Sequence, residues 1–135
     1  VTPALREAYA EGDDEELAEV AIGEAALASL RLLAAESDPR LRRAVLIAEV
    51  PDDSVTLRPD LDDAVVRIAG PVSLEHIVAA YVDNAAAEPA VKAAVEVIDE
   101  ADLGDEDAEL TVGDAQDHDL AWYATQELPF LLELL

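Results

Sequence analysis

The sequence predicts an α+β fold of two layers, in which one mostly antiparallel sheet is covered by helices. Three short apolar segments that suit strands follow one another without a helix between them, which favours antiparallel pairing. The segments that suit helices are grouped before and after these strands, which places them against a face of the sheet. We expect the 135 residues to form a single α+β domain, residues 1–135, that is N-terminally incomplete.

Two helices are expected before the strands. Thr2 can cap a helix and Pro3 suits the first helical position, which predicts a short helix to about residue 10. Asp13 and Asp14 can cap a second helix, because apolar side chains recur behind them at helical spacing to about residue 36. Gly23 within this helix indicates close packing against a neighbour or a slight bend.

The middle of the chain predicts three strands. Residues 44–50 and 64–69 are short apolar segments bounded by turn signals, and the first suits a strand buried on both faces. The polar segment 52–63 between them predicts a loop. Ser73 can cap a single helical turn, after which residues 77–82, rich in Val, Ile and Tyr, predict the third strand. One continuous helix from Ser73 to the end of this segment is the alternative.

A helix, a strand and a final helix are expected after these strands. Pro89 opens the first helix, in which three apolar side chains share one face (Val91, Val95 and Ile98). Apolar and polar residues alternate over 109–112, which predicts a half-exposed strand. Thr125 can cap the terminal helix.

The charge of the chain argues against several classes of partner. Eight Lys and Arg residues stand against 32 Asp and Glu residues, which gives a net charge of -24 at pH 7. A negative field of this size repels phosphate backbones and anionic lipid head groups, so we expect no nucleic acid and no membrane as partner. Positive charge is concentrated only at Arg40, Arg42 and Arg43, too short a segment to overturn the total. Self-repulsion should also oppose compaction at low salt.

Several kinds of chemistry are missing from the sequence. It contains no cysteine, which rules out disulfides and thiol nucleophiles. It has no glycine-rich phosphate loop and no GxSxG motif, so we lean against an enzyme. No apolar run reaches the roughly 18–20 residues that a membrane span needs. These observations predict a cytoplasmic protein without a cofactor.

The C-terminal tail carries most of the side chains capable of specific chemistry. The segment Asp117-His118-Asp119 combines carboxylates with an imidazole, which can bind a divalent cation or hold a general base, with His76 or Asp83 completing the set. A solvated loop explains the same segment. We favour the loop and expect no metal site.

Aromatic side chains in the same tail offer a second kind of site. Trp122 and Tyr123, with Tyr81 and Phe130, can wall a ligand pocket or anchor a partner. In a chain so poor in large residues, Trp122 and Phe130 are more simply core residues that dock the terminal helix, and we favour that interpretation. If a ligand site is present, we expect six residues to line it: Tyr81, His118, Asp119, Trp122, Tyr123 and Glu127.

Two segments together resemble a known family. Residues 1–17, VTPALREAYAEGDDEEL, and residues 117–128, DHDLAWYATQEL, are similar to an uncharacterised family of small actinobacterial proteins, a domain of unknown function, and the likeness runs over the whole chain. The resemblance implies a bacterial cytoplasm and an additional strand and helix upstream of the Val1-Thr2-Pro3 segment, which this chain lacks. It implies no activity.

These observations lead to one favoured hypothesis and two alternatives. The favoured hypothesis is a small acidic, non-enzymatic interaction or accessory protein that forms a homodimer or binds a basic protein partner. The first alternative is a small ligand-binding or metal-binding protein or enzyme with a site near Asp117–Glu127. The second alternative is an acidic mimic that occupies a nucleic-acid-binding partner.

Overall fold

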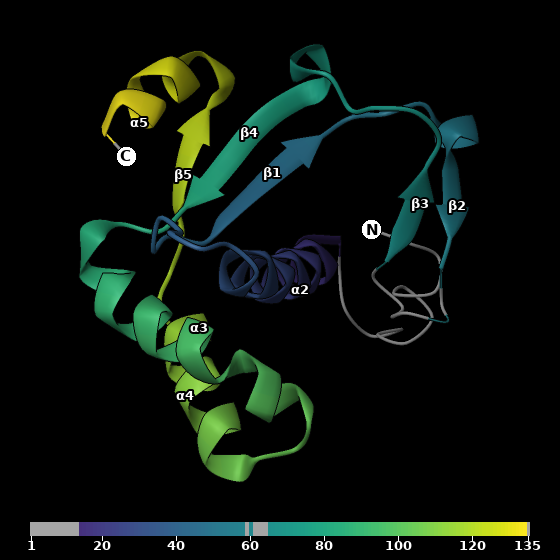
Figure 1. Ribbon diagram of the computed structural model, residues 1–135. Helices are drawn as coiled ribbons and strands as arrows, with labels where there is room; N and C mark the ends of the chain where they lie inside the picture. The colour runs from purple at the N-terminus through teal and green to yellow at the C-terminus, as the bar shows by residue number, and fades with distance from the viewer. Residues whose placement is uncertain (1–13, 59, 61–64, 135) are drawn as a thin grey trace.

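The computed structural model describes residues 14–58, 60 and 65–134 and confirms the α+β class (Figure 1). The short helix predicted for residues 2–10 lies outside the described residues. The helices and strands follow the order α2 (Asp14–Ala34), β1 (Ala44–Ala48), β2 (Val55–Leu57), β3 (Val66–Ile68), β4 (Ile77–Val82), α3 (Glu88–Asp102), α4 (Glu106–Gln116), β5 (Ala121–Ala124) and α5 (Leu128–Leu134).

The larger sheet is antiparallel and has the strand order β1-β4-β5. Its register aligns Val45, Tyr81 and Trp122 in one row across the three strands. Side chains alternate between the faces of a strand, so this row lies on one face while Ala80, which packs against Leu131 of α5, lies on the other. Because α2 packs on the first face, helices cover both faces of the sheet rather than one (Figure 1).

Only one face of β1 is covered by the described residues, which corrects the expectation that this segment is buried on both faces. Val45 is buried, whereas Leu46, one position further along, is 57% exposed. The two residues point to opposite faces, and β1 lies beyond the part of the second face that α5 covers (Figure 1).

A second, two-stranded antiparallel sheet pairs β2 with β3 to one side of the larger sheet (Figure 1). The strand predicted at residues 64–69 is confirmed, whereas the loop predicted at 52–63 is wrong at Val55–Leu57. These three residues are apolar or β-branched and pair with β3. The acidic residues around them concealed this strand in the sequence.

α3 and α4 form a helical hairpin, so the strand predicted at residues 109–112 is wrong. Asp105 is the N-cap of α4, where its Oδ1 accepts a hydrogen bond from the backbone N of Ala108 at 2.9 Å. The buried side chains of α4 recur at i, i+4 and i+7 (Ala108, Val112 and Ala115). Helical periodicity and a cap therefore outweigh the short alternation that suggested a strand.

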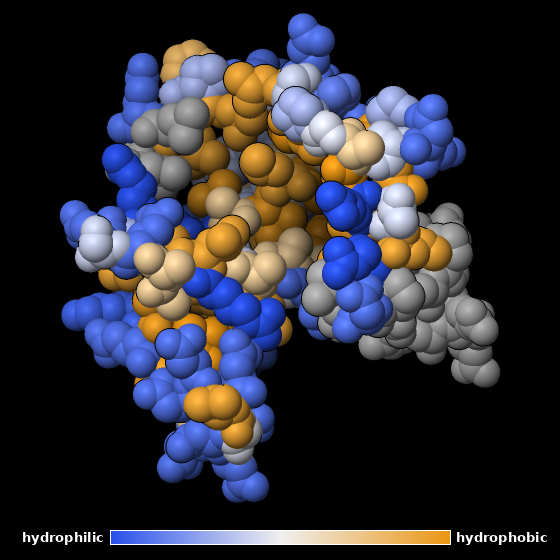
Figure 2. Space-filling view, turned by 45° about the vertical axis from the view of Figure 1, so that its right-hand side comes forward, coloured by the Kyte–Doolittle hydropathy of each residue, from blue (hydrophilic) through white to orange (hydrophobic). Residues whose placement is uncertain are grey.

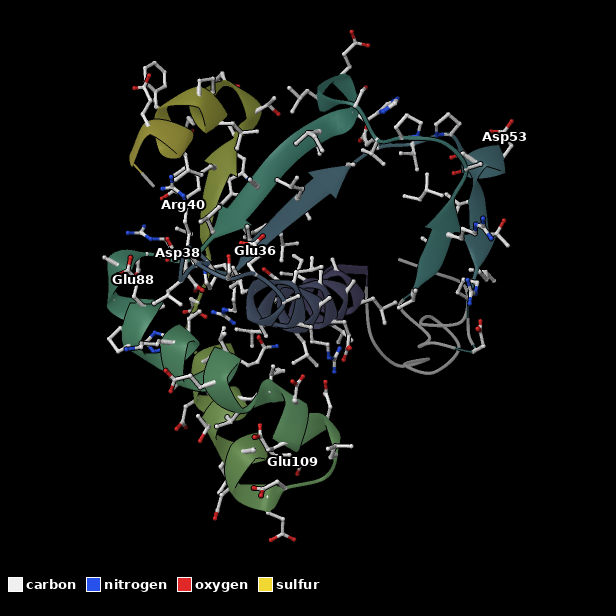
Figure 3. All side chains as sticks on the ribbon, viewed as in Figure 1. Glu36, Asp38, Arg40, Asp53, Glu88 and Glu109 are labelled. Atoms are coloured by element: carbon white, nitrogen blue, oxygen red, sulfur yellow. The ribbon has the colours of Figure 1, made fainter. Side chains whose placement is uncertain are left out.

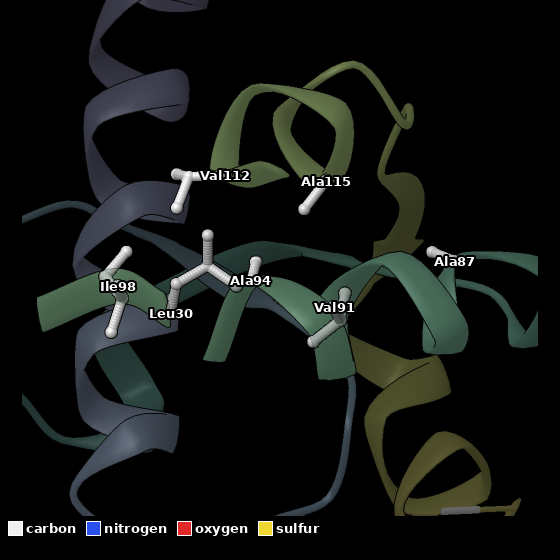
Figure 4. Close-up of a cluster of buried hydrophobic side chains, with 7 residues drawn as sticks. All are labelled: Leu30, Ala87, Val91, Ala94, Ile98, Val112 and Ala115. Carbon is white, nitrogen blue, oxygen red and sulfur yellow. The ribbon is translucent and has the colours of Figure 1, made fainter. Parts of the chain in front are cut away.

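The largest hydrophobic cluster lies between α2, α3 and α4 (Figure 4). Leu30 of α2 meets Val91 and Ile98 of α3, and all three are buried. Val95, the third member of the stripe predicted for α3, is only half-buried against this cluster. The remaining buried members are small aliphatic side chains (Ala87, Ala94, Val112 and Ala115). Such side chains let the helices approach closely, which suits a chain poor in large residues.

The terminal helix is anchored by Leu131 rather than by aromatic side chains. Leu131 is buried against Ala80 and Val82 of β4. Trp122 and Phe130, both expected in the core, are 57% and 69% exposed. Trp122 is exposed because it lies on the edge strand β5, on the face opposite α5, and Phe130 points about 100° away from Leu131 around α5.

Two expected caps have different outcomes. Ser73 forms a capping box with His76 around the 3-10 turn Leu74–His76, and β4 follows directly, as predicted. Thr125 does not cap α5, because its Oγ1 donates a hydrogen bond to the carbonyl oxygen of Ile77 at 2.9 Å. This bond ties the end of β5 to the start of β4.

Carboxylates project from several sides of the molecule, among them Glu36, Asp38, Asp53 and Glu109 (Figure 3). Figure 2 shows mostly hydrophilic side chains, with a few exposed apolar ones, over the α3–α4 hairpin, and apolar side chains around a hollow at the centre of the view. None of the helices in the described part of the chain combines the length and the apolarity that a membrane span requires.

Candidate functional site

An open cleft with a volume of about 630 Å³ lies where α2, the end of β4 and the segment between α4 and β5 meet. These segments are far apart in the sequence, so the cleft forms only when the chain folds. Ten of the residues that the structure describes line it: Glu19, Ile22, Gly23, Ala26, Arg43, Tyr81, Gln116, His118, Asp119 and Leu120.

The floor of the cleft rests on a buried ion pair between Arg43 and Asp83, whose side chains are 2% and 0% exposed. The pair is bidentate, with Arg43 Nε donating to Asp83 Oδ2 at 2.9 Å and Nη2 donating to Oδ1 at 2.8 Å. The backbone N of Arg43 also donates to Asp83 Oδ2 at 2.8 Å. Several strong hydrogen bonds thus offset the cost of burying two charges.

Gln116 connects this ion pair to the helices. Arg43 Nη1 donates to Gln116 Oε1 at 2.9 Å, and Gln116 Nε2 donates to the carbonyl oxygen of Gly23 in α2 at 3.0 Å. Arg43 Nη2 donates in addition to the carbonyl oxygen of His118 at 2.7 Å. The network therefore fixes the positions of the segments that surround the cleft. It also leaves the floor electrically balanced, because the charge of Arg43 is matched by Asp83.

Part of the wall of the cleft is apolar. Ile22 and Ala26 extend from α2, and Leu120 extends from the segment before β5. Tyr81 of β4 contributes a half-buried aromatic ring. Gly23 lines the same wall, and a Cβ built on it meets no atom of the described residues within 4 Å, so this glycine does not serve close packing against them.

The rim of the cleft is acidic. Glu19 of α2 and Asp119 of the segment before β5 are exposed and contribute their carboxylates from two different segments. His118 is half-buried and adds an imidazole. The cleft thus combines an apolar wall segment with negative charge at its mouth.

Three of the six residues predicted for a ligand site, Tyr81, His118 and Asp119, line this cleft. A fourth, Trp122, pairs with Tyr81 across β4 and β5 and lies on the same face of the sheet, beside the cleft. The solvated loop predicted for this segment fits Asp117 and Asp119, which are exposed, but His118 between them is half-buried.

The other two predicted residues lie elsewhere. Tyr123 is directed to the opposite face of the sheet, where it packs against the cluster of Ala80, Val82 and Leu131. Glu127 is exposed beyond the other end of β5, and its Oε1 accepts a hydrogen bond from the backbone N of Ala124 at 3.4 Å. Strand alternation separates Tyr123 from its neighbour Trp122.

The cation site considered for Asp117-His118-Asp119 does not assemble. The carboxylate of Asp83 is occupied by Arg43. His76 lies at the opposite end of β4, where its Nδ1 accepts a hydrogen bond from the backbone N of Ser73 at 3.2 Å. Within the ranges that the structure describes, no three His, Asp or Glu side chains are grouped so that they can hold a metal ion.

The ion pair beneath the cleft was not predicted, although the sequence carries a signal for it. Arg43 directly precedes β1 and Asp83 directly follows β4, and the register pairs Ala44 with Val82. In an antiparallel pair the residues before one strand and after the other come together. The contribution of Gln116 has no such signal, because it depends on how α4 packs.

Comparison with known families gives one match. A family model described as a family of unknown function (DUF6912) matches residues 1–132, nearly the whole sequence. No curated protein and no solved structure matches the chain.

Proposed function

Since the chain belongs to the DUF6912 family, whose function is unknown, we propose a function from its charge and its surface. The protein is a cytoplasmic, non-enzymatic accessory protein that binds a basic partner protein. Its acidic surface attracts the partner, and complementary charge speeds and orients the encounter.

The distribution of charge carries this proposal. Most of the arginines of the described residues are paired with carboxylates in four ion pairs: Arg31–Asp102, Arg42–Glu88, Arg43–Asp83 and Arg58–Asp60. Pairing neutralises these cations within the protein, so the outward field comes from the remaining carboxylates of a chain with a net charge of -24. Such a surface suits a cationic partner.

The same charge favours a different protein over a second copy of this chain. Two copies would each carry a net charge of -24 and repel one another, most strongly at low salt. A basic partner removes this repulsion instead of adding to it. The partner should therefore be held most tightly at low ionic strength.

Affinity capture at about 0.15 M salt, followed by reconstitution with the purified partner, tests the proposal. At this salt concentration, attraction between exposed charges more than about 8 Å apart is screened, so weak non-specific binding to the acidic surface is reduced. We expect a basic protein that forms a complex of fixed stoichiometry in sedimentation velocity, with affinity that falls as salt rises. A strict monomer that forms no complex of fixed stoichiometry at any salt concentration would refute it.

A second candidate function is the binding of a small ligand near Asp117–Glu127. The observation in its favour is that Tyr81, His118 and Asp119 converge on one cleft, whose volume lies in the range of about 300–1,000 Å³ typical of ligand sites. A thermal-shift screen of small metabolites tests this candidate. A metabolite that binds in the cleft should no longer raise the melting temperature of the Gly23→Leu variant, in which the new side chain fills the cleft. A metabolite that still raises it binds elsewhere.

A further inference from the structure

We propose that an arginine side chain of the basic partner lies along this open cleft, with its aliphatic stem on the apolar part of the wall and its guanidinium at the acidic rim, so that the cleft is the anchor point of the interaction. The inference rests on the proposed function and adds the place and the chemistry of recognition. Three properties of the cleft lead to it: a floor without net charge, a partly apolar wall, and an acidic rim with aromatic side chains beside it.

The floor does not attract an anion. Arg43 is the cationic side chain with a permanent charge in the lining, and it is bound bidentately by Asp83. Its Nη1 donates to Gln116 and its Nη2 donates to the carbonyl oxygen of His118. An entering phosphate or carboxylate would have to displace these bonds, at the expense of a buried ion pair.

The walls suit the aliphatic stem of a long side chain. Ile22, Ala26 and Leu120 form an apolar surface, and the methylene groups of arginine bury readily against such a surface while the charged end stays near water. A fully apolar side chain would fit the apolar wall but would gain nothing from the exposed carboxylates at the mouth.

The rim suits a guanidinium. Glu19 and Asp119 supply carboxylates, which guanidinium binds with charge-assisted hydrogen bonds. Tyr81 and its cross-strand neighbour Trp122 supply aromatic faces, on which a planar guanidinium stacks better than an ammonium does. Arginine is therefore favoured over lysine. Exposed Trp122 beside the pocket is also the side-chain type that dominates binding energy at interfaces.

The probe for the experiment is the peptide acetyl-Gly-Arg-Gly-Arg-Gly-amide, compared with the same peptide in which citrulline replaces arginine. Citrulline keeps the shape and removes the charge. Titration of the full chain is followed by the indole signal of Trp122 and the amide signals of His118 and Asp119 in NMR. The arginine peptide should shift these signals and the citrulline peptide should bind at least tenfold more weakly.

Two pairs of matched variants locate the binding. Gly23→Leu fills the cleft without changing the charge and should weaken the arginine peptide at least tenfold, because a side chain at this position enters open space in the cleft. Gly113→Leu is its control, since Gly113 is also a helical glycine with nothing within 4 Å of a built Cβ and lies outside the lining. Both substitutions replace a helical glycine by a better helix former, so both variants should fold.

The second pair changes charge alone. Glu19→Gln with Asp119→Asn removes both carboxylates of the rim and should weaken binding about three- to tenfold, in line with the modest worth of exposed ion pairs. Glu96→Gln with Glu109→Gln removes two exposed carboxylates outside the cleft and should change binding less than about twofold if the cleft is the site.

The outcomes separate the inference from the function on which it rests. Loss of binding in Gly23→Leu and in the rim variant, but not in their controls, supports the arginine pocket. Binding that all four variants share equally overturns the pocket and leaves a diffuse acidic interaction surface. A chain that binds neither the arginine peptide nor any basic protein at low salt overturns the proposed function itself.

Discussion

The buried ion pair beneath the cleft should be indispensable for stability. Asp83→Ala would leave the guanidinium of Arg43 buried without a counter-ion and would also remove the acceptor of its backbone N–H. Breaking a buried pair in this way costs about 3–5 kcal/mol. Because a domain is stable by only about 5–15 kcal/mol, the variant should lose a large part of its free energy of unfolding.

The chain contains a matched control for this substitution. Arg31 and Asp102 form the same bidentate geometry, with Nε donating to Oδ2 at 3.0 Å and Nη2 donating to Oδ1 at 2.9 Å, but their side chains are 48% and 43% exposed. Asp102→Ala should therefore cost only about 0–1 kcal/mol. Urea unfolding followed by far-UV circular dichroism measures both variants. Equal shifts of the two midpoints would show that burial is not what makes the Arg43 pair important.

A double variant sharpens the same test. Arg43→Met combined with Asp83→Ala removes both charges, so it should cost clearly less than the sum of the two single substitutions. It will not restore wild-type stability, because Gln116 and the carbonyl oxygen of His118 also lose their donor. Strict additivity would contradict a direct coupling between the two side chains.

Four further predictions concern other parts of the molecule. Leu30→Ala should lower the free energy of unfolding by about 2–5 kcal/mol, because Leu30 is fully buried, whereas Leu32→Ala on the same helix should change it by less than about 0.5 kcal/mol. Equal losses in urea unfolding would contradict the assignment of Leu30 to the core. Asp105→Ala should cost about 0.5–2 kcal/mol with a loss of helical circular dichroism, and an unchanged spectrum and midpoint would argue against the cap. The hydrogen bond from Arg31 lowers the pKa of Asp102 below its usual 3.8, so this pair contributes to the free energy of unfolding above pH 3.8, and the contribution is lost as the pH falls through the pKa of the folded state. Asp102→Asn should therefore reduce the loss of stability at acid pH, and an unchanged loss would count against the pair. The melting temperature should rise with added salt as self-repulsion is screened, and a fall would show that attractive surface pairs dominate.

The helices with long, regular apolar patterns could be predicted from the sequence. α2 and α3 combine a start signal with apolar residues at helical spacing over several turns, so local preference and burial agree. α4 could not be predicted, because its stripe consists of two alanines and one valine, and alanine is too small to mark a buried face clearly. β5 was missed because it has only four residues, at the end of a polar segment.

The candidate site was predicted only in part, for a different physical reason. Ionisable and aromatic side chains are common in binding sites, so residue type alone was enough to single out His118, Asp119 and Tyr81. Whether their side chains meet depends on which face of β4 and β5 each occupies, and a register is set by pairing rather than by local sequence. The exposed position of Trp122 follows from the same cause, because β5 is the last strand of its sheet.

The network of Arg43 links positions that are 40, 73 and 75 residues apart, and Gln116 reaches back 93 residues to Gly23. Contacts of such sequence separation require nearly the whole described chain to be in place, so we expect them to be absent from a nascent or partly opened chain. A partner that occupies the cleft would then bind only the fully folded state and shift the equilibrium away from opening. Complex formation and resistance to cellular proteases would thus both depend on the equilibrium between the fully folded and the opened chain. A chain that loses its partner would become easier to degrade.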